Sequence, residues 1–395
     1  MRSTLTVARA LVDHRVIGPV EIAIENGIIA RVRPAPPVVR PTGVIDGLLT
    51  AGMVDLQLNG AVGVDLAGTE TDAWRRMAAH QASHGVAAFA PTFITAPLEF
   101  LLDALRTTTL ARYALADQPV AQPLRAHLEG PFLSPTQPGA HNPTHLRNPS
   151  PAAIDALLDG PDASSLGVVT IAPELPGGLE ATRQLTAAGV TVSIGHTDAT
   201  ADEVARAADH GATLVTHLFN AQRRFSHRDP GVVGRALTDE RLICGLIADG
   251  HHVADDAVRL AFAAAGDRIA LVSDAVATAG LPPHPRPLRT QHGTTSADEP
   301  PRLADGTLAG SGLFLDVAVS NSVALGIAPE LALTAATATP AAAVGHPGGR
   351  LEPGLRADLV LWDDDLRVRA TWIGGCRVNA PPSGPRPELA TSARP

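Results

Sequence analysis

Short apolar runs alternate with amphipathic, Ala-rich segments of helical length through most of the chain after residue 52. Apolar runs bounded by turn residues favour buried strands, and segments with a period near 3.6 residues favour helices. The predicted strands are 53–58, 86–91, 124–129, 168–171, 190–195, 213–217, 242–247 and 269–273. Helices are predicted between most of them, at 71–84, 97–112, 178–188, 200–209 and 254–265. Eight such strands over roughly 250 residues predict an α/β fold of the TIM (β/α)8 barrel type.

Both ends of the chain have a different pattern, in which apolar and polar positions alternate as in half-buried strands. Residues 4–33 alternate around Glu25-Asn26-Gly27, a strong hairpin signal, and residues 356–378 alternate in the same way. We therefore expect one small β-sandwich domain, residues 1–48 plus 349–379, beside a barrel of residues 49–348. Residues 380–395 are expected to be a disordered tail.

Between the eighth strand and the final strands we expect a long loop or flap at 281–306, because that stretch has little periodicity. Helices are expected at about 312–325 and 330–343.

Composition and charge exclude several classes of protein. The formal net charge of -9 leaves no general basic surface for nucleic acid or an anionic membrane. The two cysteines, Cys244 and Cys376, cannot form a disulfide framework or a Cys-based metal site. The most apolar later segment, 323–344, contains a Glu and two Pro and is not a membrane span. We expect a soluble cytoplasmic enzyme with no nucleic-acid or membrane partner.

Distinctive polar residues fall where four of the predicted strands end. Glu129 ends the third strand, His196 follows the fifth, His217 ends the sixth and Asp274 follows the eighth. The carboxyl ends of barrel strands meet at one face, where the active sites of TIM barrels lie. Each residue alone is as easily a structural histidine or a capping carboxylate, but the coincidence of four favours a functional site.

One carboxylate and two imidazoles suit a catalytic divalent metal that keeps one position open for water. Glu129, His196 and His217 are therefore the predicted ligands of one metal ion, and Asp274 is the predicted general base and acid. Zinc fits this set of ligands best, with Fe2+, Mn2+ or Co2+ as alternatives.

A basic loop follows His217 and is a candidate anion site. Arg223, Arg224, His227 and Arg228 in this loop could bind phosphate or carboxylate, or could simply be a solvated loop. Asp249, His251 and His252 follow the seventh strand beside the same face. No Gly-rich phosphate loop is present, which argues against a nucleotide cofactor.

A series of motifs in one order runs through nearly the whole chain. They are DLQLNG (55–60), PTFIT (91–95), HLEGPFLSP with GAHNP (127–143), IAPE (171–174), VSIGHTDAT (192–200), THLFNA (216–221), HRDPGVVG (227–234), IADGHHV (247–253), VSDAVATAG (272–280) and LADGTLAGS (303–311). With these motifs the chain resembles the N-acetylglucosamine-6-phosphate deacetylases of the amidohydrolase superfamily. The resemblance implies a metal-dependent hydrolase that releases acetate from an amino-sugar phosphate.

The resemblance also implies roles for individual residues. It assigns Glu129, His196 and His217 to the metal and Asp274 to acid/base catalysis. It assigns substrate contacts to Ala140, His141, Asn220, Ala221, Arg228, His252, Leu308, Ala309 and Gly310, with Arg228 and His252 at the phosphate. Relatives complete the phosphate site with the neighbouring subunit, so a homodimer is implied.

The chain departs from the common pattern at several places, including His251, where an aliphatic residue is common, and residues 281–302, which match poorly. Two further departures bear on the metal and the substrate, and the first of them is shared with the one-metal branch of this family. Gln57-Leu58-Asn59 stands where the superfamily usually has His-x-His, which argues against a second metal. Residues 222–224 are Gln-Arg-Arg where relatives tend to have Met and Pro, so the substrate is the more open question. N-acetylgalactosamine 6-phosphate or an N-acyl amino acid is an alternative substrate, and a non-catalytic binding protein is a further alternative.

Overall fold

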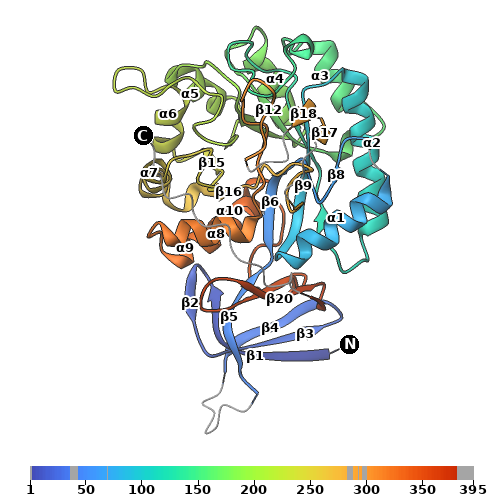
Figure 1. The fold of residues 1–395 in the computed structure, drawn as a ribbon, viewed down its shortest axis with the longest axis vertical. Coiled ribbons are helices and arrows are strands. Elements are labelled where there is room, and N and C mark those ends of the chain that lie inside the picture. The colour runs from blue at the N-terminus through green and yellow to red at the C-terminus, as the bar shows by residue number, and fades with distance from the viewer. Residues whose placement is uncertain are drawn as a thin grey trace.

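Two bodies lie one above the other in Figure 1: an α/β barrel and a small domain made of strands from both ends of the chain. The computed structural model describes residues 2–35, 43–68, 70–282, 288–291, 293–295 and 300–379. The expected tail, 380–395, and parts of the expected flap at 281–306 lie outside these ranges. The predicted TIM barrel is confirmed, and the β-sandwich domain expected from both termini is found as a separate domain built on one 8-stranded sheet.

Parallel strands form the wall of the barrel, and each predicted barrel strand overlaps an observed one. They are β6 (Met53–Leu58), β9 (Val86–Ile94), β11 (Ala126–Glu129), β12 (Leu166–Ile171), β13 (Thr191–Ile194), β14 (Leu214–Val215), β15 (Ile243–Leu246) and β16 (Ile269–Leu271). The short β10 (Gln122–Pro123) also pairs with β9. Most of their side chains are buried on both faces, which explains why the strands are continuous apolar runs rather than alternating ones.

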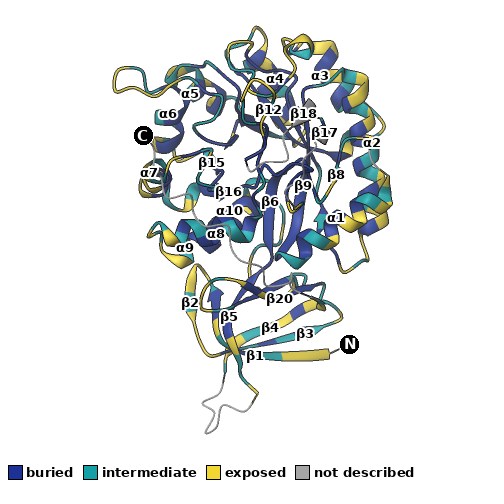
Figure 2. Cartoon of the chain, viewed as in Figure 1, coloured by how far each residue is buried: buried dark blue, intermediate teal, exposed yellow. Residues whose placement is uncertain are grey.

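Helices cover the outside of this wall, with their exposed residues facing outward in Figure 2. They are α1 (Thr71–Ser83), α2 (Leu98–Leu115), α3 (Pro151–Leu158), α4 (Gly178–Ala187), α5 (Ala201–Asp209), α6 (Gly231–Thr238), α7 (Asp255–Ala265), α8 (Leu315–Ala324), α9 (Pro329–Ala336) and α10 (Ala338–Ala343). Short strands β7 (Gly60–Ala61) and β8 (Val64–Asp65) pair with each other, as do β17 (Leu288–Thr290) and β18 (Gly293–Thr295). No helix in the described ranges is long and apolar enough to span a bilayer.

The single helix expected at 330–343 is in fact two, α9 and α10. Thr337 separates them with φ -124° and ψ -83°. Pro340 has no N–H for the carbonyl of Ala336, four residues earlier, so a continuous hydrogen-bond ladder is not available there.

The seam between β16 and β6 closes the barrel with side chains as well as backbone. The N–H of Asp274 donates to the Gln57 carbonyl (2.9 Å), and the N–H of Asn59 donates to the Ala275 carbonyl (2.8 Å). Oδ1 of the buried Asp55 accepts from the N–H of Ser273 (3.2 Å). The seam therefore brings the residues after β16 beside the end of β6.

The small domain is one curved sheet with the strand order β21-β20-β19-β5-β1-β3-β4, and β2 pairs with β1. Its strands are β1 (Arg2–Val12), β2 (Arg15–Ile17), β3 (Val20–Glu25), β4 (Ile28–Pro34), β5 (Ile45–Ala51), β19 (Leu359–Trp362), β20 (Val368–Ile373) and β21 (Cys376–Asn379). Asn26 and Gly27, both with positive φ, make the predicted turn between β3 and β4. The inner face of the sheet encloses a core of its own that includes Val7, Ile22, Leu49 and Leu359.

The other face of the sheet packs against the barrel. Trp362 on β19 is fully buried in the barrel's core cluster, together with Leu48 and Ile373. Its indole Nε1 donates to Oγ1 of Thr50 (2.9 Å). Trp362 thus contributes apolar burial and one satisfied hydrogen bond to the contact between the two bodies.

We expect Trp362→Ala to lower the free energy of unfolding by about 3–5 kcal/mol, because it leaves a large cavity in this contact. Trp362→Phe keeps most of the apolar surface and should cost about 1–2 kcal/mol, mainly for the lost hydrogen bond. Urea unfolding of the two variants measures both values. Equal losses would show that the indole body contributes little to the contact.

Candidate active site

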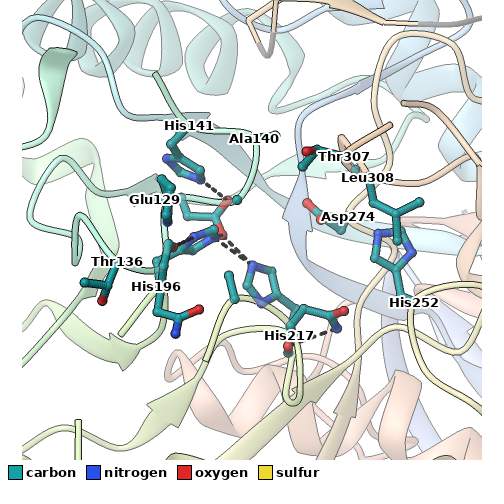
Figure 3. Close-up of a pocket in the computed structure, with 16 residues that line it drawn as sticks. Glu129, Thr136, Ala140, His141, His196, His217, His252, Asp274, Thr307 and Leu308 are labelled. Atoms are coloured by element: carbon teal, nitrogen blue, oxygen red, sulfur yellow. Dashed lines mark hydrogen bonds and ion pairs between the residues drawn. The ribbon is translucent and has the colours of Figure 1, made fainter. Parts of the chain in front are cut away.

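The four polar residues predicted from strand ends converge at the C-terminal face of the barrel, as Figure 3 shows. Glu129 is the last residue of β11, and the other three follow β13, β14 and β16. His196, His217 and Asp274 have positive φ values of 47°, 25° and 48°. This left-handed conformation costs a non-glycine residue roughly 1–2 kcal/mol. The backbone is therefore strained at each of these strand ends, where it places a side chain in the site.

Three side-chain atoms meet at one point. Oε1 of Glu129 lies 3.1 Å from Nε2 of His196 and 2.9 Å from Nε2 of His217. The two imidazole nitrogens are 3.1 Å apart. Ligands about 2.1 Å from a tetrahedral metal are roughly 3.4 Å apart, so this triangle is close to the size a divalent metal requires.

The hydrogen bond at the far side of the His196 ring sets its tautomer. Nδ1 of His196 faces the backbone carbonyl of Gln137 (3.0 Å), which can only accept, so Nδ1 carries the proton. Nε2 is then the ring position that can bind a metal through its lone pair. Without a metal, a proton on Nε2 can instead be donated in a hydrogen bond to Oε1 of Glu129.

His141 has the opposite arrangement. The backbone N–H of Thr95 can only donate, and it lies 3.3 Å from Nδ1, which makes Nδ1 the acceptor. The Thr95 hydroxyl, 2.8 Å from Nδ1, can donate to it as well, so Nε2 carries the proton. Nε2 lies 3.9 Å from Oε2 of Glu129. Glu129, His141 and His196 also form a possible ligand group by distance, with atoms within 4.8 Å of one another. Two groups are therefore compatible with a metal by distance, and the shorter contact of His217 Nε2 with Glu129 favours Glu129, His196 and His217.

The two buried carboxyl groups of the site, Glu129 and Asp274, have very different pKa values. Burial raises the pKa of Glu129, but hydrogen bonds and charge from His196 and His217 outweigh it and hold that pKa well below its usual value. Burial and the nearby Glu129 raise the pKa of Asp274 to about 7. Glu129 is thus a permanent acceptor, whereas Asp274 is suited to gaining and losing a proton near neutral pH.

Two amides hold one oxygen of Asp274. Asn59 Nδ2 and Gln57 Nε2 both donate to Oδ1, at 2.8 and 3.0 Å. Gln57 Nε2 also donates to Oε2 of Glu129 (3.2 Å). Oδ2 of Asp274 has no hydrogen-bond partner in the described part of the chain. Gln57 and Asn59 had been noted in the sequence only as replacements for His-x-His, and their contacts give them a role in orienting Asp274.

A cavity of about 300 Å3 opens over these residues. Of the substrate-contact residues predicted from the resemblance, those that line it are Ala140, His141, Asn220, Ala221, His252, Leu308 and Gly310. Ala309 is fully buried and is not in the lining. Residues 136–139 and Thr307 line the cavity and were not singled out, although they stand inside or beside the motifs around 127–143 and 303–311.

The predicted phosphate residues are not all brought together within one chain. His252 lines the cavity, and its Nδ1 faces Oδ2 of Asp249 at 2.7 Å. Arg223 forms ion pairs with Asp229 and Asp198 (2.7 and 3.2 Å), and these carboxylates neutralise its charge. Arg228 is exposed on the same loop and is absent from the cavity lining. No arginine among the described residues lines this cavity.

A barrel with two imidazoles and an ionised carboxylate converging beside a titratable Asp defines a metal-dependent hydrolase. The chain belongs to the amidohydrolase family, whose model matches residues 48–378. Its sequence is 37% identical to the N-acetylgalactosamine-6-phosphate deacetylase of Escherichia coli O157:H7, over 95% of this chain and 99% of that one. It is 38% identical to the N-acetylglucosamine-6-phosphate deacetylase of Homo sapiens, over 83% and 82% of the two chains.

A solved structure supports the same family membership. An Asp-to-Ala variant of N-acetyl-D-glucosamine-6-phosphate deacetylase from Mycobacterium smegmatis, in complex with N-acetyl-D-glucosamine-6-phosphate, matches with a TM-score of 0.89. The two are 32% identical over 96% of this chain and 100% of the other. The family resemblance expected from the motifs is therefore confirmed.

The two roles, metal ligand for His217 and hydrogen-bond donor for His141, predict different results for His217→Gln and His141→Gln. His217→Gln should reduce bound metal well below one ion per chain, because it removes a ligand. His141→Gln should keep the wild-type metal content and lose turnover by about 10²–10³, because it removes only a donor to the reacting carbonyl. Metal analysis after dialysis, with kcat measured on the same samples, separates the two. Metal loss in His141→Gln alone would assign the site to Glu129, His141 and His196.

Proposed function

We propose that this protein hydrolyses the N-acetyl group of N-acetylglucosamine 6-phosphate to glucosamine 6-phosphate and acetate. The observation that carries the proposal is the triangle of Glu129, His196 and His217 atoms beside Asp274, whose Oδ1 is held by two amides. The curated relatives and the solved structure named above, all at least 30% identical, act on or bind acetylated amino-sugar phosphates according to their names.

A divalent metal held by Glu129, His196 and His217 would polarise the acyl carbonyl and lower the pKa of water at the site. We propose zinc rather than iron, manganese or cobalt, because two imidazoles and one carboxylate are a typical set of ligands for catalytic zinc. Gln57 and Asn59 occupy the positions from which a second ion would be held, so one ion per chain is proposed.

The side chains of this protein then carry the proton and the developing charge. His141 Nε2–H donates to the acetyl oxygen as negative charge develops there. Oδ2 of Asp274 takes a proton from the attacking water while Oδ1 stays fixed by Gln57 and Asn59. The water oxygen bonds to the acyl carbon, and Asp274 returns its proton to the sugar nitrogen as the C–N bond breaks. The products are acetic acid, which ionises to acetate, and the free amine, which takes up a proton.

Phosphate recognition is proposed to need two chains. His252, Asn220 and Ala221 are on the lining of the cavity, whereas Arg228 is exposed and outside it. We propose a homodimer in which Arg228 of one chain meets the phosphate held in the other. Ala140 and the 308–310 segment are proposed to contact the sugar. The expectation of a cytoplasmic protein stays a proposal, consistent with cysteines that form no disulfide.

A second substrate has a specific observation in its favour. The Escherichia coli relative named for N-acetylgalactosamine 6-phosphate matches 95% of this chain, compared with 83% for the human relative. The two sugars differ only in the configuration of one hydroxyl, so the same metal chemistry serves both.

Acetate release by the zinc-reconstituted protein tests the function. N-acetylglucosamine 6-phosphate should be preferred over its galactose epimer, and the unphosphorylated sugar should be a poor substrate. A preference for the epimer would identify N-acetylgalactosamine 6-phosphate as the substrate and would leave the proposed mechanism unchanged. Absence of acetate from all three compounds with metal bound would overturn the deacetylase assignment.

Mixed dimers test the position of Arg228. Asp274→Asn chains should lose turnover by about 10²–10⁴, and Arg228→Ala chains should have a raised KM for phosphorylated substrate. The two variant chains are co-expressed with different tags and purified as mixed dimers. Each mixed dimer should contain one fully competent site, in which the Asp274 of the Arg228→Ala chain lies beside the Arg228 of the Asp274→Asn chain. If Arg228 acts within its own chain, the mixed dimer should show no recovery beyond half the activity of Arg228→Ala.

A further inference from the structure

A second cavity, of about 220 Å3, lies at the N-terminal end of the barrel strands, opposite the active site. Its wall includes Arg125 just before β11, Gly167 at the start of β12, Arg112 of α2 and residues 344–347 after α10. The chain returns from residues 344–347 toward the small domain, so the cavity lies near the junction between the two bodies.

The two arginines at this cavity give it positive charge. Arg112, Arg125 and His346 line it, and no Asp or Glu is among its lining residues. This is unusual in a chain with 40 acidic residues against 31 basic ones. Ion pairs neutralise many arginines elsewhere, such as Arg106 with Asp103 on α2 (2.6 Å). The cavity is therefore a local concentration of unmatched positive charge.

Arg112 has no hydrogen bond or ion pair with any described residue, although it is only partly exposed. Burial and the nearby Arg125 both lower the pKa of Arg112, and no carboxylate counteracts them. The imidazole of His346 likewise has no hydrogen bond with a described residue, and burial and then Arg356 lower its pKa. An anion at this position would relieve these unfavourable interactions.

Arg125 is held in place by contacts outside the cavity. Its Nη1 and Nη2 both donate to the carbonyl of Gly189, each at 3.2 Å. A guanidinium fixed in this way loses little entropy when an oxyanion binds, and forked arginine donors match the oxygens of phosphate. The volume is below the roughly 300–1,000 Å3 of pockets that hold drug-sized ligands, which favours a small group.

We infer that this cavity is a second anion site, which binds a phosphate group through Arg112, Arg125 and His346. The inference does not depend on the proposed function, because the cavity shares no residue with the active site. Inorganic phosphate and a small phosphate monoester present the same oxygens to the arginines. Occupation should stabilise this end of the barrel rather than change the chemistry.

The imidazole of His346 reports on this site and not on the active site. Its C2–H signal, assigned with His346→Gln, should titrate at a higher pH when phosphate is present at constant ionic strength, because an adjacent anion favours the imidazolium. Arg112→Met should abolish the phosphate-dependent shift or weaken the apparent affinity at least tenfold. Arg106→Met, which changes the same charge on the same helix outside the cavity, should behave as wild type. All three should keep wild-type kcat.

An unchanged His346 titration in the wild-type protein with inorganic phosphate and with glucose 6-phosphate would overturn the proposal without any variant. A shift with phosphate but not with the monoester would restrict the site to the free ion, and the reverse would restrict it to the ester. An equal shift in Arg112→Met and wild type would remove Arg112 from the site and contradict the inference.

Discussion

The arrangement of the active site depends on one buried carboxylate that stays ionised. Burying Glu129 alone would cost several kcal/mol and would favour its neutral form. Two imidazoles at 2.9 and 3.1 Å from the same oxygen reverse that preference and hold its pKa low. The same negative charge helps to raise the pKa of Asp274. One carboxylate therefore organises the metal position and prepares its neighbour for proton transfer.

Backbone strain accompanies this arrangement and is offset by the surrounding hydrogen bonds. Two further residues after β14, Phe219 and Ala221, also have positive φ. The N–H of Thr197 donates to the Ala221 carbonyl (3.1 Å), which ties the loop after His196 to the loop after His217. Gln222 closes the second loop by accepting from the N–H of Phe219 and donating to a carbonyl of the same loop. His196 and His217 are thus held by one connected unit.

A polar layer inside the barrel supports the same face from below. His127 faces Oγ1 of Thr170 (2.7 Å), Thr170 meets Thr216 (2.7 Å), and Thr216 meets Ser193 (2.6 Å). These hydroxyls belong to neighbouring strands of the barrel, β11, β12 and β13 and the residue after β14. Because every member has a partner, the layer fixes the strands relative to one another without leaving a buried polar group unpaired.

The periodicity of the chain was sufficient to predict the barrel strands, because strands buried on both faces are unbroken apolar runs with turn residues between them. Polar residues at strand ends predicted Glu129, His196, His217 and Asp274, since parallel strands deliver their ends to one face. The opposite protonation of His141 and His196 could not be read from sequence, because it depends on a backbone N–H in one case and a carbonyl in the other. Only the tertiary structure decided that Arg228 lies outside the cavity of its own chain, because long-range packing, not local sequence, sets where an exposed loop points.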